Sequence, residues 1–585
     1  GGAAELKEAL DERCHTVLKH VAEQIGITAV TGEDDLYVVG TAATLARLQL
    51  TPGPALVLGD GIRDWSIQEE HCVLWPYDTN FKVTELADLS QPERSVLWTQ
   101  RSTIRRRKRF GTPMVDRGLA WWEWQELYIT KLRTPISIAF ASVATHNHFV
   151  LDRAGRIFKQ SAPVIKLPAR SSINDHLGLL ALLNSSTACF WMQQVFHNKG
   201  STVDAKGARQ TTVAWDNYFD MDGTKLQNFP LPAGDRPATQ GRRLDELASM
   251  LTSRQPGSLG NSQPPTREWF NAARADVNHL EGQLVSAQEE LDWHCLHLYG
   301  VTDPGFTAGD GQSAPPLSLG ERAFEIALAR KHAAGEAENA WFTRHRSTPI
   351  TELPDHWPEW YQALVERRIE LIETDRNVGL VERPEHKRRW SRTPWEDLEQ
   401  AALRDWLLDK LEDRTLWFEG DRATTRSLAQ LADRAAAHPE WGADWMDVAR
   451  LLMGQQEVDA LAVVTKLVTD EHVPAQAAAR YKPSGVTKRA EWERTWDLQR
   501  AEDRGEDVGR IAVPPKYAQS DFVKASFWKQ RCKLDVPKER FTSVAGAEKD
   551  ASSGDGTMVL AWAGFDHAQL TQALATLLFQ RQTTD

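Results

Sequence analysis

Hydrophobic and polar positions divide the first part of the chain into stretches of different period. Apolar side chains recur every three or four residues over 3–25, which predicts an amphipathic helix. Residues 54–65 form an apolar strand that ends in a Gly-Asp-Gly turn. Residues 135–152 and 161–168 are rich in residues that favour strands, whereas 173–196 returns to the helical period. The chain up to about residue 232 is therefore predicted to be mixed α/β.

The second part of the chain is predominantly helical in pattern. Residues 233–265 are rich in Pro, Gly, Ser, Gln and Arg and low in apolar side chains, which predicts a loop or linker. Residues 266–300 form one long helical pattern with charges four residues apart, and a Pro/Gly-rich break follows at 301–319. Most of 320–500 is rich in Ala, Leu, Glu and Arg and is predicted to be helical, whereas the tail from 511 is mixed.

These patterns predict an α+β protein in which a mixed α/β domain is followed by long helices and a largely α-helical C-terminal region. A chain of 585 residues is long enough for several domains. The predicted boundaries give an N-terminal α/β part at 1–100, a second α/β domain at 101–232, a linker and long helix at 233–319, a helical domain at 320–510 and a mixed tail at 511–585.

Composition places the chain among ordinary globular proteins, with 41% hydrophobic and 26% charged residues. No apolar run approaches the roughly 20 residues that a membrane-spanning helix needs. The N-terminus shows no secretory leader, in which a basic stretch precedes an apolar one. The five cysteines form neither a CxxC pair nor a disulfide framework. We therefore expect a cytoplasmic protein with reduced thiols and no membrane partner.

Charge is strongly segregated, although the whole chain carries a formal charge of −12. Residues 1–100 hold 7 Lys and Arg against 16 Asp and Glu, whereas residues 101–170 hold 14 against 4. A local basic field can attract a polyanion even when the molecule is acidic overall. The alternative is a solvated basic face that binds nothing.

The basic stretch contains the candidate phosphate contacts. Each such contact releases counterions and positions a protein on nucleic acid without reading its sequence. The candidates are Arg101, Arg105, Arg106, Arg107, Lys108 and Arg109, followed by Lys131, Arg133, Arg153, Arg156, Lys159 and Lys166.

Two neighbouring stretches are candidates for contacts with sugars or bases. Trp121, Trp122 and Trp124 could make such contacts, although core packing is expected for at least one of them. The loop at 197–212 contains glycines that would let backbone N–H groups approach a phosphate or a base edge closely. Its cations are Lys199, Lys206 and Arg209. The alternative for this stretch is a plain flexible loop.

Catalytic motifs are absent or incomplete. The chain has no phosphate-binding GxxxxGK[ST] loop, no GxSxG elbow and no cysteine and histidine cluster with zinc spacing, so we expect no metal. The VPPKY stretch at 513–517 lacks the Asn or Asp that amino-methyltransferases use to accept a hydrogen from the target amino group. LPD at 353–355 with EHK at 385–387 echoes a metal-dependent nuclease pattern, but the surroundings are polar and the intervening stretch is helical.

Several stretches resemble known families. The stretch from LAWWEWQELYITKLRTPISIAF to FKQSAPVIKL, followed by LGLLALLNSSTACFWMQQVFHNKG, resembles the TaqI-type target-recognition domain of adenine-specific DNA methyltransferases. RNVGLVERPEHKRRW at 376–390 and FWKQRCKLDVPKERF at 527–541 resemble the PglX methyltransferase family of phage growth limitation and type 2 BREX systems. The resemblance implies N6 methylation of adenine in a short DNA site, which marks host DNA for an anti-phage defence.

The resemblance also implies what this chain lacks. In the family, an N-terminal domain binds S-adenosylmethionine and holds the catalytic tetrapeptide; neither is recognisable here, and the chain begins Gly-Gly without an initiating Met. We therefore expect no catalytic residues and no cofactor in this chain, which would contribute site recognition. The implied partners are double-stranded DNA, the N-terminal methyltransferase domain and other defence proteins. The alternative is a protein-interaction scaffold with only non-specific DNA affinity.

Overall fold

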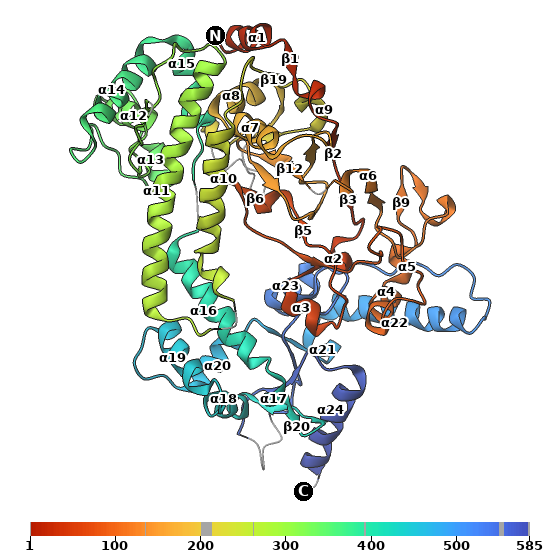
Figure 1. Cartoon of the computed structure of the whole chain (residues 1–585). Helices are drawn as coiled ribbons and strands as arrows, with labels where there is room; N and C mark the ends of the chain where they lie inside the picture. The colour runs from red at the N-terminus through yellow and green to blue at the C-terminus, as the bar shows by residue number, and fades with distance from the viewer. Residues whose placement is uncertain are drawn as a thin grey trace.

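The computed structural model describes residues 2–134, 136–200, 213–260, 263–309, 311–390, 393–548 and 555–582. About 48% of the residues are helical and 13% lie in strands of many small sheets. The fold is therefore α+β and largely helical, which confirms the predicted class. Figure 1 shows lobes arranged around a pair of long helices, with the two termini at opposite ends of the molecule.

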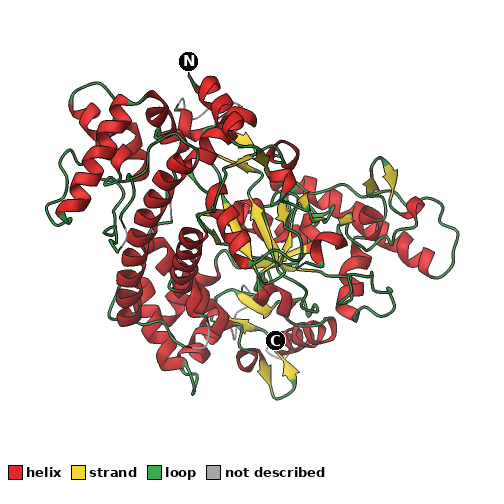
Figure 2. Cartoon of the chain, turned by 45° about the horizontal axis from the view of Figure 1, so that its top comes forward, coloured by secondary structure: helices red, strands yellow, loops and turns green. Residues whose placement is uncertain are grey.

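A four-stranded antiparallel sheet forms the centre of the first half of the chain. Its strand order is β14 (Phe149–Asp152), β12 (Ser137–Phe140), β16 (Val164–Lys166) and β2 (Gln24–Gly26). Every residue of β12, β14 and β16 is buried, because helices and loops cover both faces (Figure 2). The predicted strands at 135–152 and 161–168 are therefore confirmed.

Two helices pack beside this sheet where the sequence predicts one. α7 (Ile173–Leu183) ends at Asn184, and α8 (Ser186–Val195) begins after Ser185, whose Oγ accepts the N–H of Ala188. The Asn184 side-chain amide accepts the N–H of Phe149 and donates to its carbonyl at the start of β14. The LLNSS stretch therefore fastens the helix junction to the sheet.

The helix predicted over 3–25 forms only in the first half of that range. α1 (Ala3–Arg13) ends before Thr16, and β1 (Thr16–Val17) pairs with β19 (Pro230–Leu231). Residues 24–26 then join the central sheet as β2. Pairing with strands distant in the sequence therefore overrides the local helical period.

The two long helices include one that the sequence analysis missed. α11 (Arg267–Leu298) confirms the helix expected at 266–300 and begins where Thr266 accepts the N–H of Trp269. α10 (Ala238–Ser253) lies in the stretch expected to be a linker. Its apolar stripe of Leu244, Leu247 and Leu251 is buried, so a narrow stripe in a polar background is enough for a packed helix.

The region from 320 to 510 is mainly helical, as predicted. One group covers the upper part of α11 and comprises α12 (Ala323–Ala333), α13 (Ala340–His345), α14 (Glu359–Thr374) and α15 (Arg376–Val381). A second group forms the lower lobe in Figure 1 and comprises α16 (Trp395–Leu411), α18 (Leu428–Ala436), α19 (Gly442–Met453), α20 (Ala460–Val468) and α24 (His567–Gln582). A sheet of β22 (Arg426–Ser427), β25 (Val559–Trp562), β24 (Phe541–Ser543) and β23 (His472–Pro474) completes that lobe.

A third lobe projects sideways and is built from both ends of the sequence. It contains α4 (Gln91–Thr99), α5 (Arg101–Ile104), the hairpin of β9 (Lys108–Arg109) and β10 (Thr112–Pro113), α22 (Pro483–Asp503) and α23 (Ala525–Arg531). Trp496 Nε1 donates to the Thr99 carbonyl at 2.9 Å, which joins α22 to α4. We call this lobe the hairpin arm.

The remaining elements are short. The helices are α2 (Asp34–Tyr37), α3 (Ala42–Arg47), α6 (Ile129–Leu132), α9 (Gly223–Leu226), α17 (Arg414–Trp417) and α21 (Ala477–Arg480). The strands are β3 (Ala29–Val30), β4 (Val38–Gly40), β5 (Leu56–Val57), β6 (Ile62–Arg63), β7 (Ser66–Ile67), β8 (Cys72–Val73), β11 (Glu126–Leu127), β13 (Val143–Ala144), β15 (Ile157–Phe158), β17 (His197–Gly200), β18 (Tyr218–Asp220), β20 (Phe418–Glu419) and β21 (Arg422–Ala423).

The large hydrophobic cores extend across the predicted domain boundaries. One core contains Leu6, Phe190, Leu284 and Trp390, and the core of the hairpin arm contains both Trp124 and Trp492. The five sequence ranges given above stay a prediction, because packing joins residues from several of them.

Candidate nucleic-acid interface

The basic stretch 101–109 runs from α5 into the hairpin of the arm. Ser90 and Glu93 form a capping box that starts α4, and α5 follows it directly after Gln100. The hairpin then turns at Phe110 and Gly111, which have φ values of 50° and 82°. Two positive φ values in a two-residue loop are typical of a type I′ hairpin turn, and the hairpin projects from the arm (Figure 1).

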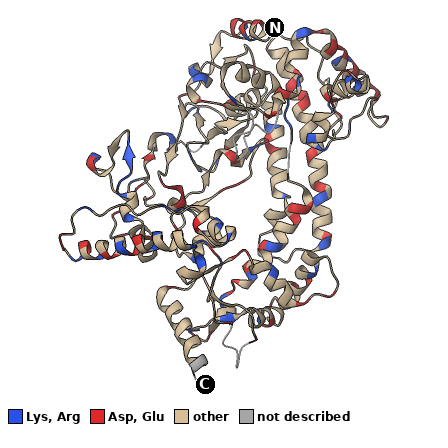
Figure 3. Ribbon diagram, turned by 180° about the vertical axis from the view of Figure 1, so that it is seen from behind, with Lys and Arg blue, Asp and Glu red and all other residues tan. Residues whose placement is uncertain are grey.

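Acidic side chains at the end of α22 partly neutralise the start of the basic stretch. Arg101 pairs with Glu502 at 2.9 Å and with Asp503 at 2.6 Å, while Arg105 pairs with Glu502 at 3.2 Å. The side chain of Arg105 nevertheless stays 52% exposed. Figure 3 shows basic residues on the hairpin and residues of both signs along the neighbouring helix α22.

Arg107 requires a correction, because it lies inside the arm. It is 8% exposed and donates to the carbonyls of Thr31, Trp121 and Glu123 and to the Tyr37 hydroxyl. Together with a bond from Nε to the Ile104 carbonyl, these bonds pair all three guanidinium nitrogens within the fold. Arg107 therefore braces the base of the hairpin and does not belong to the exposed surface.

A hollow of about 450 Å³ lies between the basic stretch and the segment that follows α22. Its cationic lining residues are Arg101, Arg105, Arg106, Lys108 and Arg510, and its acidic ones are Asp116 and Glu502. Arg106 donates to the Ile511 carbonyl, and its pKa is lowered by burial and by the neighbouring Arg510. The two guanidinium groups repel each other, and a bound anion in the hollow would reduce that repulsion.

The three tryptophans of residues 121–124 support the arm from within. Trp124 is buried and donates to the Leu74 carbonyl, which confirms that at least one of the three packs in the core and removes Trp124 from the candidate DNA contacts. Trp122 donates to the Thr84 carbonyl and meets Trp121 edge to face at 5.4 Å, and both rings are half-buried against the same core. The aromatic cluster is therefore mainly a packing feature.

The remaining predicted cations are dispersed. Lys131 donates to the Ile27 carbonyl, and burial lowers its pKa. Lys159 is mostly buried and pairs with Asp34, whereas Arg133 is exposed. Lys199 pairs with Asp220 at 3.0 Å. Lys206 and Arg209 lie outside the described residues, as does the 201–212 part of the predicted loop.

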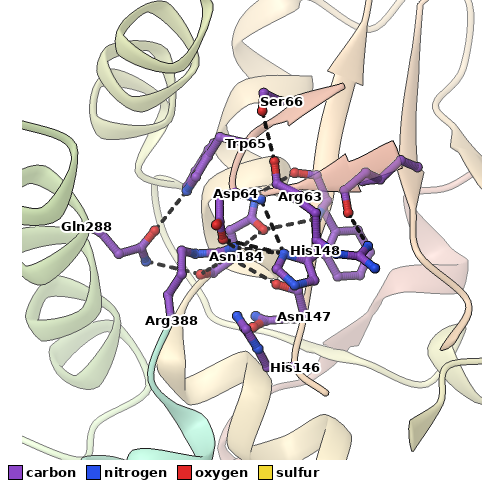
Figure 4. A network of polar contacts seen from close by, with 12 residues as sticks. Arg63, Asp64, Trp65, Ser66, His146, Asn147, His148, Asn184, Gln288 and Arg388 are labelled. Atoms are coloured by element: carbon purple, nitrogen blue, oxygen red, sulfur yellow. Dashed lines mark hydrogen bonds and ion pairs between the residues drawn. The ribbon is translucent and has the colours of Figure 1, made fainter. Parts of the chain in front are cut away.

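A second polar site, shown in Figure 4, is buried beside the central sheet. Arg388 Nη1 lies 3.1 Å from Asp64 Oδ1 and 3.2 Å from His148 Nδ1. Its Nη2 donates to the Asn147 carbonyl at 3.0 Å and to Asn184 Oδ1 at 2.9 Å. Arg388 thus ties the segment at 383–390 to the sheet and to the α7–α8 junction.

Asp64, His146 and His148 form the group of described residues whose donor atoms could hold a metal ion. A cation there would face the guanidinium of Arg388, which already contacts Asp64 and His148. Burial, followed by neighbouring cationic groups, lowers the pKa of both histidines well below the usual value. The positive charge of Arg388 already pairs with Asp64 in this group, and it would repel a cation placed beside it.

The nuclease-like residues do not assemble into a site. Lys387 is buried and contacts Glu289, Glu382 and Asp292 at 3.4, 2.9 and 3.0 Å, whereas Asp355 is exposed. The residues before Lys387 form a 3-10 turn at Pro384–His386 and not the strand that the nuclease pattern needs. This buried charge cluster is structural.

Two features were not singled out from the sequence: Arg510, which lines the basic hollow, and the hairpin tip at Phe110 and Gly111 beside it. Arg510 is distant in the sequence, and no local pattern links it to residues 101–109. A Gly directly after an aromatic residue in a basic run is a turn signal that could have located the tip.

Comparison with known proteins identifies the family. Residues 284–585 match DUF7008, a domain of unknown function, and the chain belongs to this family. The chain is also 41% identical over 595 residues to the adenine-specific methyltransferase PglX of Streptomyces coelicolor. The match covers 98% of this chain and 48% of that protein, so this chain spans about half of the relative's length and corresponds to its C-terminal half. No helix among the described residues is long and apolar enough to cross a membrane.

Proposed function

We propose that this chain is the DNA target-recognition and scaffold part of a site-specific DNA adenine-N6 methyltransferase that marks host DNA in an anti-phage defence. The similarity to an adenine-specific methyltransferase supports the reaction class. The observation that carries the DNA contact is the basic hollow between α5, the hairpin and residue 511. Within the described part of the chain, Arg106, Lys108 and Arg510 have no carboxylate at ion-pair distance, so their charge is available to phosphates.

The stretch that resembles a methyltransferase tetrapeptide does not fit the transfer step. Val513 has no side-chain acceptor for the adenine amino group. Tyr517 is buried and stacks on Tyr481 at 4.9 Å, with the two rings 3° from parallel. Its ring faces are therefore not open to a flipped base. We propose that S-adenosylmethionine binding and methyl transfer belong to an N-terminal methyltransferase domain, and that this chain contacts that domain and other defence proteins.

DNA binding in solution tests the proposal. The chain should bind a duplex of about 30 base pairs, with affinity falling about 100-fold between about 50 and 200 mM NaCl if four phosphates are contacted. The double variant Arg105→Glu/Lys108→Glu should bind at least about tenfold more weakly and show a shallower salt slope, because two phosphate contacts are lost. Fluorescence anisotropy measures both quantities.

A matched control uses two exposed lysines on other lobes, Lys331 of α12 and Lys466 of α20. Lys331→Glu/Lys466→Glu makes the same change of net charge and should leave the affinity within about twofold. A scaffold with incidental charge would bind DNA weakly and respond equally to both double variants. That result, or no binding at low salt, would exclude the basic hollow as a DNA contact.

A further inference from the structure

The tip of the hairpin carries an unusually exposed aromatic side chain. Phe110 is 73% exposed, the highest value among the large hydrophobic side chains that the structure describes as exposed. Monomeric proteins tolerate scattered surface hydrophobics, so exposure alone assigns no role. The hairpin of β9 projects from the arm (Figure 1). Phe110 lies in its turn, and Lys108 and Pro113 on either side of that turn line the basic hollow, so the position of Phe110 requires an explanation.

The turn itself does not favour phenylalanine. Phe110 has φ 50°, in the left-handed region that Asn, Asp and Gly adopt most readily. The register Arg109↔Thr112 and Lys108↔Pro113 fixes a two-residue loop, and Gly111 completes it with φ 82°. A residue that opposes its own backbone conformation and buries little surface does not serve the folding of the hairpin. A strained and exposed side chain of this kind indicates a functional role.

The surroundings of the ring are cationic. The guanidinium of Arg109 lies 5.7 Å from the ring centroid of Phe110, and that of Arg117 lies 5.6 Å away. Arg117 and Lys108 are exposed, and Lys108 also lines the basic hollow. A partner for this tip must therefore present negative charge around a flat apolar surface. Nucleic acid does so, because phosphates flank stacked bases.

We propose that Phe110 is a wedge that enters the base stack of bound DNA and fills the gap left when a nucleotide rotates out of the helix. Lys108 and Arg117 contact the flanking phosphates. This inference rests on the proposed function, since a methyltransferase that acts on adenine must extract the base from the duplex. Apolar side chains that enter a base step offset part of the lost stacking. The rigid two-residue turn holds the ring in position before DNA arrives.

The experiment compares two duplexes of the same sequence, one intact and one with a central abasic site that mimics an extruded base. The full chain should bind the abasic duplex about tenfold more tightly than the intact duplex. Phe110→Ala should reduce this preference to less than about twofold while keeping the affinity for intact DNA and its salt slope. Phe110→Trp should retain the preference, because indole stacks at least as well.

A matched control is Phe579→Ala, which removes an exposed phenylalanine on α24 in another lobe and should leave the preference unchanged. The wedge proposal is wrong if Phe110→Ala keeps the full preference for the abasic duplex. It is also wrong if the wild type shows no preference but binds intact DNA in the salt-dependent manner. In both cases the proposed function stands. Absence of any duplex binding overturns the proposed function as well. Loss of binding to phosphatidylserine vesicles in Phe110→Ala, with unchanged DNA preference, would assign the tip to a membrane surface instead.

Discussion

At the scale of single residues, the most constrained group is Lys387. Its side chain is 1% exposed, and its ammonium lies within 3.4 Å of carboxylate oxygens of Glu289, Glu382 and Asp292. Burial raises the pKa of Glu382 to about 7, with Lys387 opposing that shift, and the three carboxylates hold the pKa of Lys387 above its usual value despite burial. The lysine thus neutralises acidic groups that otherwise would repel one another.

Lys387→Met should lower the free energy of unfolding by about 3–5 kcal/mol, because it removes the ammonium that three buried carboxylates share. The loss should be larger at pH 8 than at pH 6, since the carboxyl of Glu382 is mostly protonated at the lower pH. Urea unfolding followed by tryptophan fluorescence at both pH values measures the effect. Lys331→Met, at an exposed position on α12, is the control and should change the free energy by less than about 0.5 kcal/mol. Equal stability of the two variants would show that the cluster does not need its lysine.

Residue-level prediction from sequence succeeded where exposure follows from local chemistry and failed where it depends on packing. Arg105 and Lys108 lie on the surface, as a basic run predicts. Arg107 lies in the same run but is bonded to carbonyls of two other segments. Arg510 completes the hollow from the far end of the chain. No pattern within residues 101–109 carries the information that separates these three outcomes.

At the scale of elements, helix α22 both supports and restrains the basic stretch. Gln499 of α22 accepts the Ser102 N–H and donates to the Trp98 carbonyl, so the helix holds α4 and α5 in place. Its last turn also presents Glu502 and Asp503 to the arginines. Burial alone would raise the pKa of Asp503, but hydrogen bonds from Arg101 and Trp98 hold it below its usual value. Under the proposed function, the helix end would compete with DNA phosphates for the same guanidinium groups.

Glu502→Gln/Asp503→Asn should therefore tighten DNA binding about three- to tenfold at low salt, the opposite sign to loss of the cations. The gain should shrink as salt rises, because these pairs are partly exposed and screened. Anisotropy titrations at two salt concentrations measure the change. The control Glu506→Gln/Asp507→Asn alters two exposed acids just beyond the helix. If both variants gain equally, general charge and not competition explains the result.

Docking of α22 is itself testable. Gln499→Ala leaves the buried Ser102 N–H and the Trp98 carbonyl without their partners, which should cost about 1–3 kcal/mol. Amide hydrogen exchange should rise over α4 and α5 and remain unchanged in the central sheet. Arg500→Ala, at an exposed neighbouring position, is the control. Uniform loss of protection in all lobes would contradict a local role for Gln499.

At the scale of the whole molecule, the buried histidines make the fold sensitive to acid. Burial lowers the pKa of His386 and of His472 to about 4 and that of His345 to about 3. These three residues come from separate parts of the fold, so their effects should add.

Stability changes with pH because the unfolded and folded chains bind different numbers of protons. Between pH 6.5 and about 4 the unfolded chain binds protons at these histidines and the folded chain does not, so stability falls as pH decreases. For His386 alone the loss at pH 5 is about 2 kcal/mol. The melting temperature should therefore drop steadily from pH 7 to pH 5, and His386→Gln should flatten the drop. A melting temperature independent of pH over this range would contradict the neutral buried state.

The overall architecture was predictable from the sequence to the extent that patterns are local. The apolar repeat of 266–300 is uninterrupted, and α11 follows it closely. The apolar stripe of α10 is narrow, and the low apolar content of the surrounding sequence predicted a linker there. The strand at Thr16–Val17 depends on a partner at Pro230–Leu231, which a local window does not contain. The hydrophobic cores likewise combine residues that are distant in the sequence, so local patterns do not predict their membership.

The construction of the hairpin arm from both ends of the sequence has a consequence for biosynthesis. Trp98 and Arg101 emerge from the ribosome long before Gln499 and Asp503, with which they pair. The arm can adopt its final form only once the residues up to Asp503 have been translated. Chains that terminate before Asp503 would therefore lack the finished basic hollow and, under the proposed function, would not occupy target sites.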